Sequence, residues 1–461
     1  MKSFASIISL GCVKNLVDSE TLTPQLAELG YSVTPDPSRA SLIVVNTCGF
    51  LTSAVEEAIE SILDLAAFKS SGSCKCLIAA GCMVQRYGKK LVKLLPEVDL
   101  FLGTSHYLEL GRILEAWQGG SSRKLWISAP RALVTDRTPR FRSGPLYSAY
   151  VKIAEGCSNH CSFCLIPHLR GPYRSRTVED VVAEIGRLCL EGVREVNLVA
   201  QDTTAFGSDR GDEVGLVRLL ESIECLDGPD WVRILYAYPD RISERLLSTI
   251  AQSKKVVPYL DIPLQHCAPR ILNDMGRGRT GMNAESLVER VRFRVPGIAL
   301  RTSLIVGFPG ETEADFRALL GFVERAGLDH VGVFAFSAEP GTRASRLTGQ
   351  VDAETKEGRR RELMELQREI SANRLRRWIG EAVPVLVEGP HPETELLLSG
   401  RLPTQAPEVD GTVIITSGPG CPGEIVPARI IDTHDYDLEA ELLTGAEWAD
   451  HSTSVSNERS V

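Results

Sequence analysis

Three cysteines within eight residues constrain this chain more than any other feature of its sequence. Residues 152–176 read KIAEGCSNHCSFCLIPHLRGPYRSR, which spaces Cys157, Cys161 and Cys164 as C-x3-C-x2-C. A short loop with this spacing can curl around one face of a cubic iron–sulfur cluster, so that each thiolate binds one iron. The fourth iron then has no protein ligand and is open to chemistry. The spacing therefore predicts a 4Fe–4S cluster that takes part in a reaction.

A structural zinc site and three unconnected core cysteines are the alternative interpretations of this triplet. Structural zinc prefers a closed set of four ligands that includes C-x2-C pairs. No fourth Cys or His follows at the spacing of a zinc knuckle, and His160 and His168 are the nearby candidates. The spacing favours the cluster over zinc.

Length and composition describe a globular protein of several domains. The 461 residues are 43% hydrophobic and 24% charged, which suits about two to four domains with ample cores. Twelve cysteines that occur in clusters favour metal binding in a reducing cytosol over a disulfide scaffold. The apolar run at residues 4–10 is short and broken by serines, and no run approaches the roughly 20 residues that a membrane helix needs. We expect a cytoplasmic protein with no membrane association.

Residues 1–118 alternate apolar runs with amphipathic stretches. This alternation predicts a Rossmann-like α/β domain, in which helices cover both faces of a mainly parallel sheet. Strands are expected at residues 4–10, 41–45, 76–80 and 98–102, and helices at residues 18–29, 53–68, 85–95 and 107–117.

Three cysteines of this domain each follow a predicted strand by one to three residues. They are Cys12 in SLGCVKN, Cys48 in VNTCGF and Cys82 in AAGCMVQ, and each has a glycine beside it. The carboxyl ends of parallel strands meet at one edge of the sheet, where ligands bind, and glycine lets the backbone pass close to a bulky cofactor. Buried cysteines and turn glycines are common, but chance explains one such coincidence better than three. We predict a second cluster with three protein ligands and one open iron.

Cys74 and Cys76 form a C-x-C in the SSGSCKC loop and are the competing ligand candidates. Cys76 begins a predicted strand and Cys74 precedes it, so both belong to the opposite edge of the sheet. We expect neither to bind the cluster.

The middle of the chain predicts a partial barrel. Residues 119–142 mix Gly, Ser, Pro and Arg without sustained periodicity and are expected to form a linker. From residue 143 to 375, helical patterns separate six strands, which predicts a partial (β/α)6 barrel; the strands are expected at residues 148–154, 195–200, 232–237, 256–262, 299–306 and 330–336. Chemistry on such barrels occurs at the carboxyl ends of the strands, and the cysteine triplet follows the first of them.

Taken together, the motifs SLGCVKNLVDSE, VVNTCGF and AAGCMVQRYG, followed by the triplet, resemble the methylthiotransferase family of radical S-adenosylmethionine (SAM) enzymes. Within it they are most similar to the RimO type, which modifies a ribosomal protein; Val13 departs from the proline that is usual there. The resemblance implies that the open iron of the triplet's cluster chelates SAM, with Phe163 beside the adenine. It also implies an auxiliary 4Fe–4S cluster on the three N-terminal cysteines.

Polar residues at other strand ends are candidates for contacts with SAM, whose ribose, adenine and sulfonium need partners. Gln201 and Thr203 follow the second barrel strand, and the turn GFPGET, which includes Gly307 and Glu311, follows the fifth. Ordinary capping of the barrel rim is an equally good explanation of these residues. Three arginines after the triplet either line the mouth as anion contacts or form a solvated face: Arg170, Arg174 and Arg176.

Residues 378–445 contain short β-type runs between Pro and Gly, which predicts a small antiparallel β-barrel. This segment resembles the TRAM module, which usually binds tRNA. From residue 380 to 445, twelve acidic side chains oppose only Arg401 and Arg429, a net charge of −10. Phosphate binding depends on Lys and Arg, so we expect this barrel to attract a basic protein rather than tRNA; solubility alone is the alternative role. Residues 446–461 are expected to be disordered.

The resemblance implies a methylthiotransferase that modifies the β-carbon of one aspartate in small-subunit ribosomal protein S-twelve. Attack on an unactivated C–H bond needs radical chemistry, which cofactors provide. The implied cofactors are two 4Fe–4S clusters and SAM, and the implied reductant is a flavodoxin or ferredoxin. One alternative is a tRNA adenosine methylthiotransferase, which predicts a basic final barrel. The other is a zinc-stabilised, noncatalytic ribosome-binding factor, which predicts zinc in place of iron.

Overall fold

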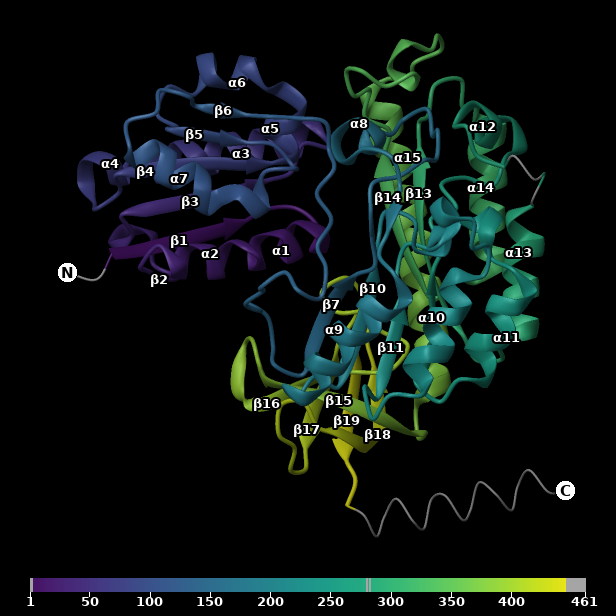
Figure 1. The fold of residues 1–461 in the computed structure, drawn as a ribbon. Helices are drawn as coiled ribbons and strands as arrows, with labels where there is room; N and C mark the ends of the chain where they lie inside the picture. The colour runs from purple at the N-terminus through teal and green to yellow at the C-terminus, as the bar shows by residue number, and fades with distance from the viewer. Residues whose placement is uncertain (1–2, 279–280, 282, 445–461) are drawn as a thin grey trace, which may run out of the picture.

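The computed structural model describes residues 3–278, 281 and 283–444. An N-terminal domain, a central barrel and a small C-terminal barrel follow one another along the chain (Figure 1). The predicted disordered tail, residues 446–461, lies outside the described residues. No helix in the described ranges combines the length and apolarity needed to cross a lipid bilayer.

The N-terminal domain is built on a six-stranded parallel sheet with the strand order β2-β1-β3-β4-β5-β6. Alternate residues of a strand point to opposite faces, so Ile43 and Val45 join one core whereas Leu42 and Val44 join the other. The strands are β1 (Ser3–Ser9), β2 (Tyr31–Val33), β3 (Leu42–Thr47), β4 (Cys76–Gly81), β5 (Leu100–Leu102) and β6 (Leu125–Trp126). The four predicted strands and the predicted two-sided helical cover are confirmed.

Two groups of helices cover these two faces. One face is covered by α3 (Thr52–Ala66), α5 (Cys82–Tyr87) and α6 (Lys89–Leu94), and the other by α2 (Leu22–Glu28) and α7 (Leu110–Gln118). The short α4 (Phe68–Ser71) follows α3. The first helix, α1 (Val13–Glu20), differs from these because its Val17 packs inside the central barrel.

The segment expected to be a linker contributes to the fold. Its residues 125–126 form β6, which pairs with β5 at the edge of the sheet. A two-residue strand is too short to produce a visible periodicity, which is why the sequence did not reveal it. Farther along, Arg140 lies 2.6 Å from Glu20 of α1 and 2.9 Å from Glu184 of the central barrel.

The central domain is an open barrel whose six parallel strands appear in the order β14-β13-β12-β11-β10-β7. All six predicted strands are confirmed: β7 (Ser148–Lys152), β10 (Glu195–Val199), β11 (Trp231–Ile234), β12 (Val256–Asp261), β13 (Ala299–Val306) and β14 (His330–Ala335). The outer helices are α9 (Val178–Leu190), α10 (Gly215–Glu224), α11 (Glu244–Gln252), α13 (Ala284–Arg294), α14 (Glu313–Ala326) and α15 (Ala353–Leu375). Short elements at the carboxyl ends of the strands are β8 (Ala154–Glu155), α8 (Ile166–Arg170), β9 (Arg174–Ser175) and α12 (Pro269–Asp274).

The C-terminal domain is a closed five-stranded barrel, as predicted, with the order β15-β16-β17-β19-β18. Its strands are β15 (Ala382–His391), β16 (Thr394–Arg401), β17 (Val413–Ser417), β18 (Ile425–Thr433) and β19 (Leu438–Leu442). One expectation needs correction, because β17 and β19 pair in parallel whereas the other ladders are antiparallel. The strand β19 begins five residues after the end of β18.

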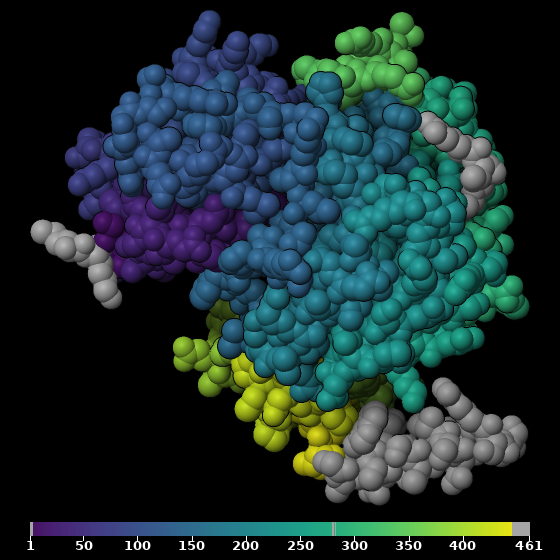
Figure 2. Space-filling view, viewed as in Figure 1, coloured from purple at the N-terminus to yellow at the C-terminus, as the bar shows by residue number. Residues whose placement is uncertain are grey.

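The C-terminal barrel closes the amino ends of the central strands, and Figure 2 shows it and the N-terminal domain as separate lobes against the central domain. Glu195, the first residue of β10, lies 2.6 Å from Arg401 and 3.1 Å from Arg233, and all three side chains are buried. Burial on its own raises the pKa of Glu195, but the two guanidinium groups outweigh burial and bring the pKa down to about 2. This ion triad fastens the C-terminal barrel to the central domain.

Replacing Arg401 by alanine is expected to destabilise this contact by about 3–5 kcal/mol, because removal of one partner leaves Glu195 with uncompensated buried charge. The measurement is the thermal unfolding midpoint of the purified variant. Arg368→Ala is the control, since Arg368 forms an exposed pair with Asp435 at 3.8 Å, worth about 0–1 kcal/mol. Equal midpoints for the two variants would contradict this role of the ion triad.

Candidate functional site

The three predicted N-terminal ligands lie together at the carboxyl edge of their sheet. Cys12 directly precedes α1, Cys48 follows β3, and Cys82 is the first residue of α5 after β4. The loops approach so closely that a Cβ atom on Gly11, whose φ is +96°, would lie 2.8 Å from the Cβ of Cys48. A Cβ atom on Gly49 would lie 2.6 Å from the carbonyl of Cys82. These two positions therefore require glycine.

Of the three cysteines, Cys12 is the most accessible to solvent, although the surrounding protein partly desolvates its thiol. Burial raises the pKa of Cys12, but the positive charges of Lys14 and Arg170 together lower it below its ordinary value. Burial raises the pKa of Cys48, and it raises that of Cys82 to about 11. This set offers three thiols, open space and nearby positive charge, which suits an anionic metal cluster.

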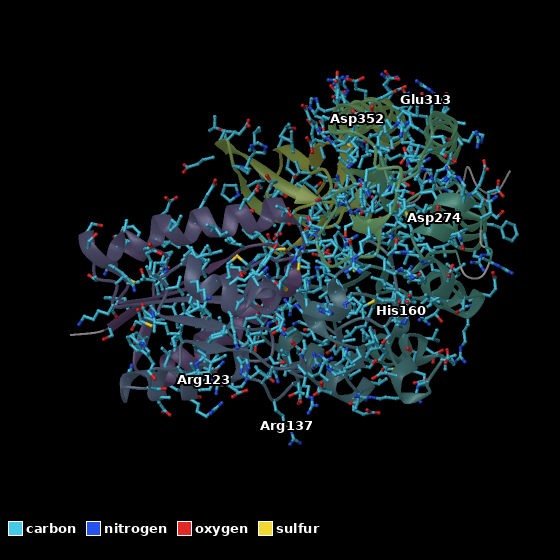
Figure 3. The ribbon with its side chains drawn as sticks, turned by 90° about the horizontal axis from the view of Figure 1, so that it is seen from above. Arg123, Arg137, His160, Asp274, Glu313 and Asp352 are labelled. Carbon is cyan, nitrogen blue, oxygen red and sulfur yellow. The ribbon has the colours of Figure 1, made fainter. Side chains whose placement is uncertain are left out.

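The triplet lies beyond the first barrel strand, as predicted. Backbone N–H groups of Asn159 and Ile166 donate to the sulfur atoms of Cys157 and Cys164, each at 3.4 Å. Burial raises the pKa of these two thiols to about 11 and about 12. Figure 3 labels His160 of this loop, on the barrel side of the boundary with the N-terminal domain.

The two sets of cysteines meet through α8, which begins two residues after Cys164. Arg170 at the end of α8 donates from Nε to the sulfur of Cys82 at 3.2 Å. Leu165, which directly follows Cys164, packs against the same thiol. Cys82 of one set is thus in contact with the residue next to the last cysteine of the other.

A buried polar network surrounds this contact. The Nη1 of Arg170 lies 2.6 Å from Asp18 of α1, and its Nη2 donates to Asn15 at 2.5 Å. Lys152 pairs with Asp18 and, at 2.8 Å, with Glu155. Because Asp18 and Asn15 belong to the N-terminal domain and the others to the barrel, the network joins the two domains.

Two of the three arginines have neither of the predicted roles. Arg170 and Arg176 are 3% and 2% exposed and paired with carboxylates, so they form neither an open mouth nor a solvated face. Arg174 is partly buried, and its Nη1 donates to the carbonyl of Pro172 at 2.7 Å.

Glu339 forms a second connection that the sequence analysis missed. It follows β14 at the barrel rim and accepts the backbone N–H of Thr52, the first residue of α3, at 2.7 Å. Its other oxygen lies 2.9 Å from Arg86, which also donates to the carbonyl of Gly49 at 3.0 Å. The loops after Cys48 and Cys82 are therefore tied to the barrel by one carboxylate.

The residues expected to contact SAM differ in whether their side chains are free to contact a ligand. The Nε2 of Gln201 donates to Glu155 at 3.0 Å, whereas its Oε1 is buried without a hydrogen-bond partner among the described residues. Phe163 is partly buried against an apolar cluster that includes Ile271 and Phe308.

Thr203, Gly307 and Glu311 make close contacts with other residues of the barrel rim. Thr203 is fully buried, and its hydroxyl donates to the carbonyl of Leu235 at 2.5 Å. Glu311 accepts the N–H of Phe308 at 3.1 Å and an Arg359 N–H at 3.0 Å. A Cβ on Gly307, whose φ is +69°, would lie 2.2 Å from Cγ of Lys356. These contacts shape the rim, as the capping alternative anticipated.

The competing cysteines lie elsewhere. Cys74 and Cys76 are buried in the two cores of the N-terminal domain, at the start of β4. Among the residues that the structure describes, no three His, Cys, Asp or Glu side chains converge tightly enough to hold a single metal ion.

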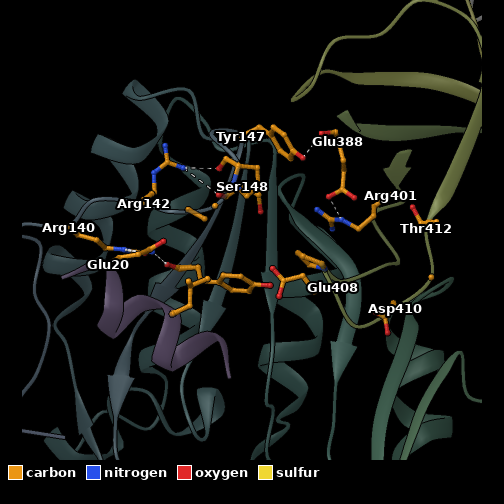
Figure 4. Close-up of a pocket in the computed structure, with 17 residues that line it drawn as sticks. Glu20, Arg140, Arg142, Tyr147, Ser148, Glu388, Arg401, Glu408, Asp410 and Thr412 are labelled. Atoms are coloured by element: carbon orange, nitrogen blue, oxygen red, sulfur yellow. Dashed lines mark hydrogen bonds and ion pairs between the residues drawn. The ribbon is translucent and has the colours of Figure 1, made fainter. Parts of the chain in front are cut away.

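A hollow of about 480 Å³ at the amino end of β7 is distinct from this site (Figure 4). It separates α1 from the C-terminal barrel, and some of its charged side chains are paired. Arg140 binds Glu20, and Arg401 binds Glu388 at 2.8 Å. It lies at the end of the strands opposite the triplet.

Three family descriptions match successive parts of the chain. Uncharacterized protein family UPF0004 matches residues 5–103, the Radical SAM superfamily matches residues 151–323, and the TRAM domain matches residues 379–443. The three matches fall on the three domains of the fold.

Relatives match nearly the whole length. A protein of Syntrophobacter fumaroxidans named ribosomal protein uS12 methylthiotransferase RimO is 60% identical over 442 residues, which cover 96% of this chain and 99% of that protein. Proteins with the same name from Syntrophotalea carbinolica and Geobacter sulfurreducens are 48% and 47% identical, over 97% and 99% of their own lengths.

Solved structures with a similar fold include the radical S-adenosylmethionine methyltransferase TsrM from Kitasatospora setae, with cobalamin and a 4Fe–4S cluster bound. The TM-score is 0.54 at 16% identity, over 75% of this chain and 74% of that chain. Identity at this level shows the fold alone. The near-full-length relatives show the family: this chain belongs to the RimO family of radical SAM methylthiotransferases.

Proposed function

We propose that this chain inserts a methylthio group at the β-carbon of an aspartate in ribosomal protein uS12. The name of its relatives supports the substrate, and the methylthiotransferase motifs support the chemistry. The observation that carries the proposal is the contact of the two cysteine sets through Arg170 and Leu165. A radical and a sulfur donor must reach the same carbon atom, which requires both sets to face one cavity.

Two 4Fe–4S clusters and SAM are the proposed cofactors. Cys157, Cys161 and Cys164 hold the cluster that binds SAM, and the auxiliary cluster binds to Cys12, Cys48 and Cys82. Bound there, these groups supply a 5′-deoxyadenosyl radical and a methylthio sulfur, which acid–base side chains cannot provide. The accessible space beside Cys12 and the unpartnered Oε1 of Gln201 fit this assignment.

For SAM itself, Gln201 is the contact with the best support. Its buried Oε1 needs a donor, and a ribose hydroxyl is a suitable one. Phe163 offers an apolar side for the adenine. Thr203, Gly307 and Glu311 act indirectly in this proposal, by fixing the strand ends between which SAM binds.

The polypeptide orients the two cofactor positions. Arg170, Asp18 and Lys152 are buried and mutually paired, so the domain boundary holds one arrangement. Arg277 is beside Cys161, and Arg170 is beside Cys82. Each guanidinium group therefore places a positive charge beside a proposed cluster ligand, and an anionic cluster favours such a charge.

The charge of the C-terminal barrel favours a basic protein as partner over tRNA. Eight of its acidic side chains are exposed, whereas Arg401 is buried and Arg429 is the exposed arginine among the described residues of this barrel; the exposed acids are Glu381, Glu393, Glu395, Glu408, Glu424, Asp432, Asp435 and Glu441. Phosphate contacts need Lys and Arg. Since this barrel adjoins the amino ends of the strands, it contacts a part of the substrate remote from the modified aspartate.

The remaining parts of the proposal follow from the family and the substrate. A low-potential donor such as flavodoxin or ferredoxin reduces the triplet's cluster. A ribosomal protein substrate puts the reaction in the cytoplasm, without membrane association. The noncatalytic zinc-binding alternative is wrong, because the chain belongs to a family of enzymes.

Replacing Cys48 by alanine is expected to abolish methylthio transfer while SAM cleavage continues, because only the auxiliary cluster loses a ligand. Iron content should fall from about eight to about four per chain. Cys74→Ala is the matched control, since Cys74 is a buried cysteine of the same domain that lies away from the cluster edge. Transfer by the Cys48 variant would exclude Cys48 as a ligand.

Anaerobically reconstituted protein, incubated with SAM, dithionite and either uS12 or tRNA, is expected to modify uS12 alone. The reason is that the acidic barrel repels phosphates and attracts a basic protein. Mass spectrometry of both substrates would show the added methylthio group. A gain confined to tRNA would support the tRNA alternative and overturn the substrate assignment.

A further inference from the structure

Lys14 is a buried cation without an anionic partner. It follows Cys12 by two residues on α1, and only 8% of its surface is exposed. Its Nζ lies 3.3 Å from the centroid of the Tyr236 ring. Among the described residues, no carboxylate lies within ion-pair distance of this ammonium and no atom accepts a hydrogen bond from it. A buried charge is costly unless it is paired, so the position calls for an anion that the polypeptide does not supply.

The position of Tyr236 directs this ammonium over the barrel mouth. Tyr236 follows β11 and has a φ of +62°, a conformation that is strained for a residue with a side chain and that concentrates at functional sites. Its backbone N–H donates to Asp261 at the end of β12 at 3.1 Å, and its carbonyl accepts from the backbone of Thr203 at 3.0 Å. The ring therefore forms a fixed platform at the carboxyl ends of the strands.

The charged groups around Lys14 leave its charge uncompensated. Asp261 is close enough for the two charges to interact, but it lies beyond ion-pair distance and has Arg301 Nε at 4.0 Å. The positive charges of Lys14 and Arg170 both act on the thiol of Cys12. Because Arg170 is itself paired with Asp18, the ammonium of Lys14 is the positive group available to a ligand there.

We propose that Lys14 binds the side-chain carboxylate of the aspartate that is modified, an inference that rests on the proposed function. The β-carbon is bonded directly to that carboxylate carbon, so an ion pair with Lys14 holds the reacting atom beside Cys12 and the auxiliary set. The methionine carboxylate of SAM is the other source of this chemistry. The substrate is favoured because Lys14 is on the side of the auxiliary cysteines, whereas SAM is assigned to the triplet.

The test measures binding of uS12, and of uS12 with the modified aspartate replaced by asparagine, to reconstituted holoenzyme. Wild type should prefer the aspartate form by about tenfold or more, as expected for a buried charge-assisted hydrogen bond. Lys14→Met should bind both forms equally, and Lys14→Arg should retain a preference. Lys69→Met is the control, because it removes a positive charge from α4, where Lys69 pairs with Asp99 at 2.6 Å. SAM affinity should be the same in all four proteins.

Three results would overturn the proposal. An unchanged aspartate preference in Lys14→Met would show that another group reads the carboxylate. A loss of SAM affinity with the preference intact would assign Lys14 to the SAM carboxylate. Loss of the auxiliary cluster's iron in both Lys14→Met and Lys14→Gln would assign it to cluster assembly. Failure of the proposed function is separately visible, since wild type would then neither bind nor modify either form of uS12.

Discussion

A buried guanidinium joins the two halves of the candidate site. Arg170 extends from the barrel to the carboxylate of Asp18 and the thiol of Cys82, both in the N-terminal domain. Taking such charges out of water costs several kcal/mol per ion, and breaking a buried pair leaves that cost unmatched. The two domains therefore cannot separate or slide without exposing or stranding these groups. The distance between the cysteine sets is a consequence of this network.

The placement of the sets also follows from sheet geometry. Each set lies past the carboxyl ends of parallel strands, where ligands collect in open α/β sheets and barrels. The first helix, α1, joins the carboxyl edge of the N-terminal sheet to the central barrel, because its Val17 packs among the inner residues of the central strands. At the amino ends, the ion triad of Glu195, Arg233 and Arg401 seals the barrel against the C-terminal domain. The cysteine triplet thus lies at the carboxyl ends of the central strands, and the contact with the C-terminal domain lies at their amino ends.

Local patterns in the sequence were sufficient for the six central strands and for the position of both cysteine sets after strand ends, because strand periodicity and strand ends are local features. Short strands such as β6 were not predicted, since two residues are too few to show a periodicity. Arg170 was misjudged because its partner Asp18 lies 152 residues away in the chain, and a charged side chain looks exposed until its partner is known. Thr203 and Glu311 stay candidates for a SAM contact or for a role in the rim, for a related reason. A polar residue at a strand end serves a ligand or the rim, and packing decides which.

The central claim is that six cysteines form two sets of three, each holding a cluster with one iron free of protein ligands, and that both clusters face one cavity. Anomalous diffraction at the iron edge from crystals of the anaerobically reconstituted protein tests it most directly. Two iron clusters are expected, one beside Cys12, Cys48 and Cys82 and the other beside the triplet, with no side chain on the fourth iron of either. A fourth protein ligand on either cluster, or protein closing the space between them, would contradict it.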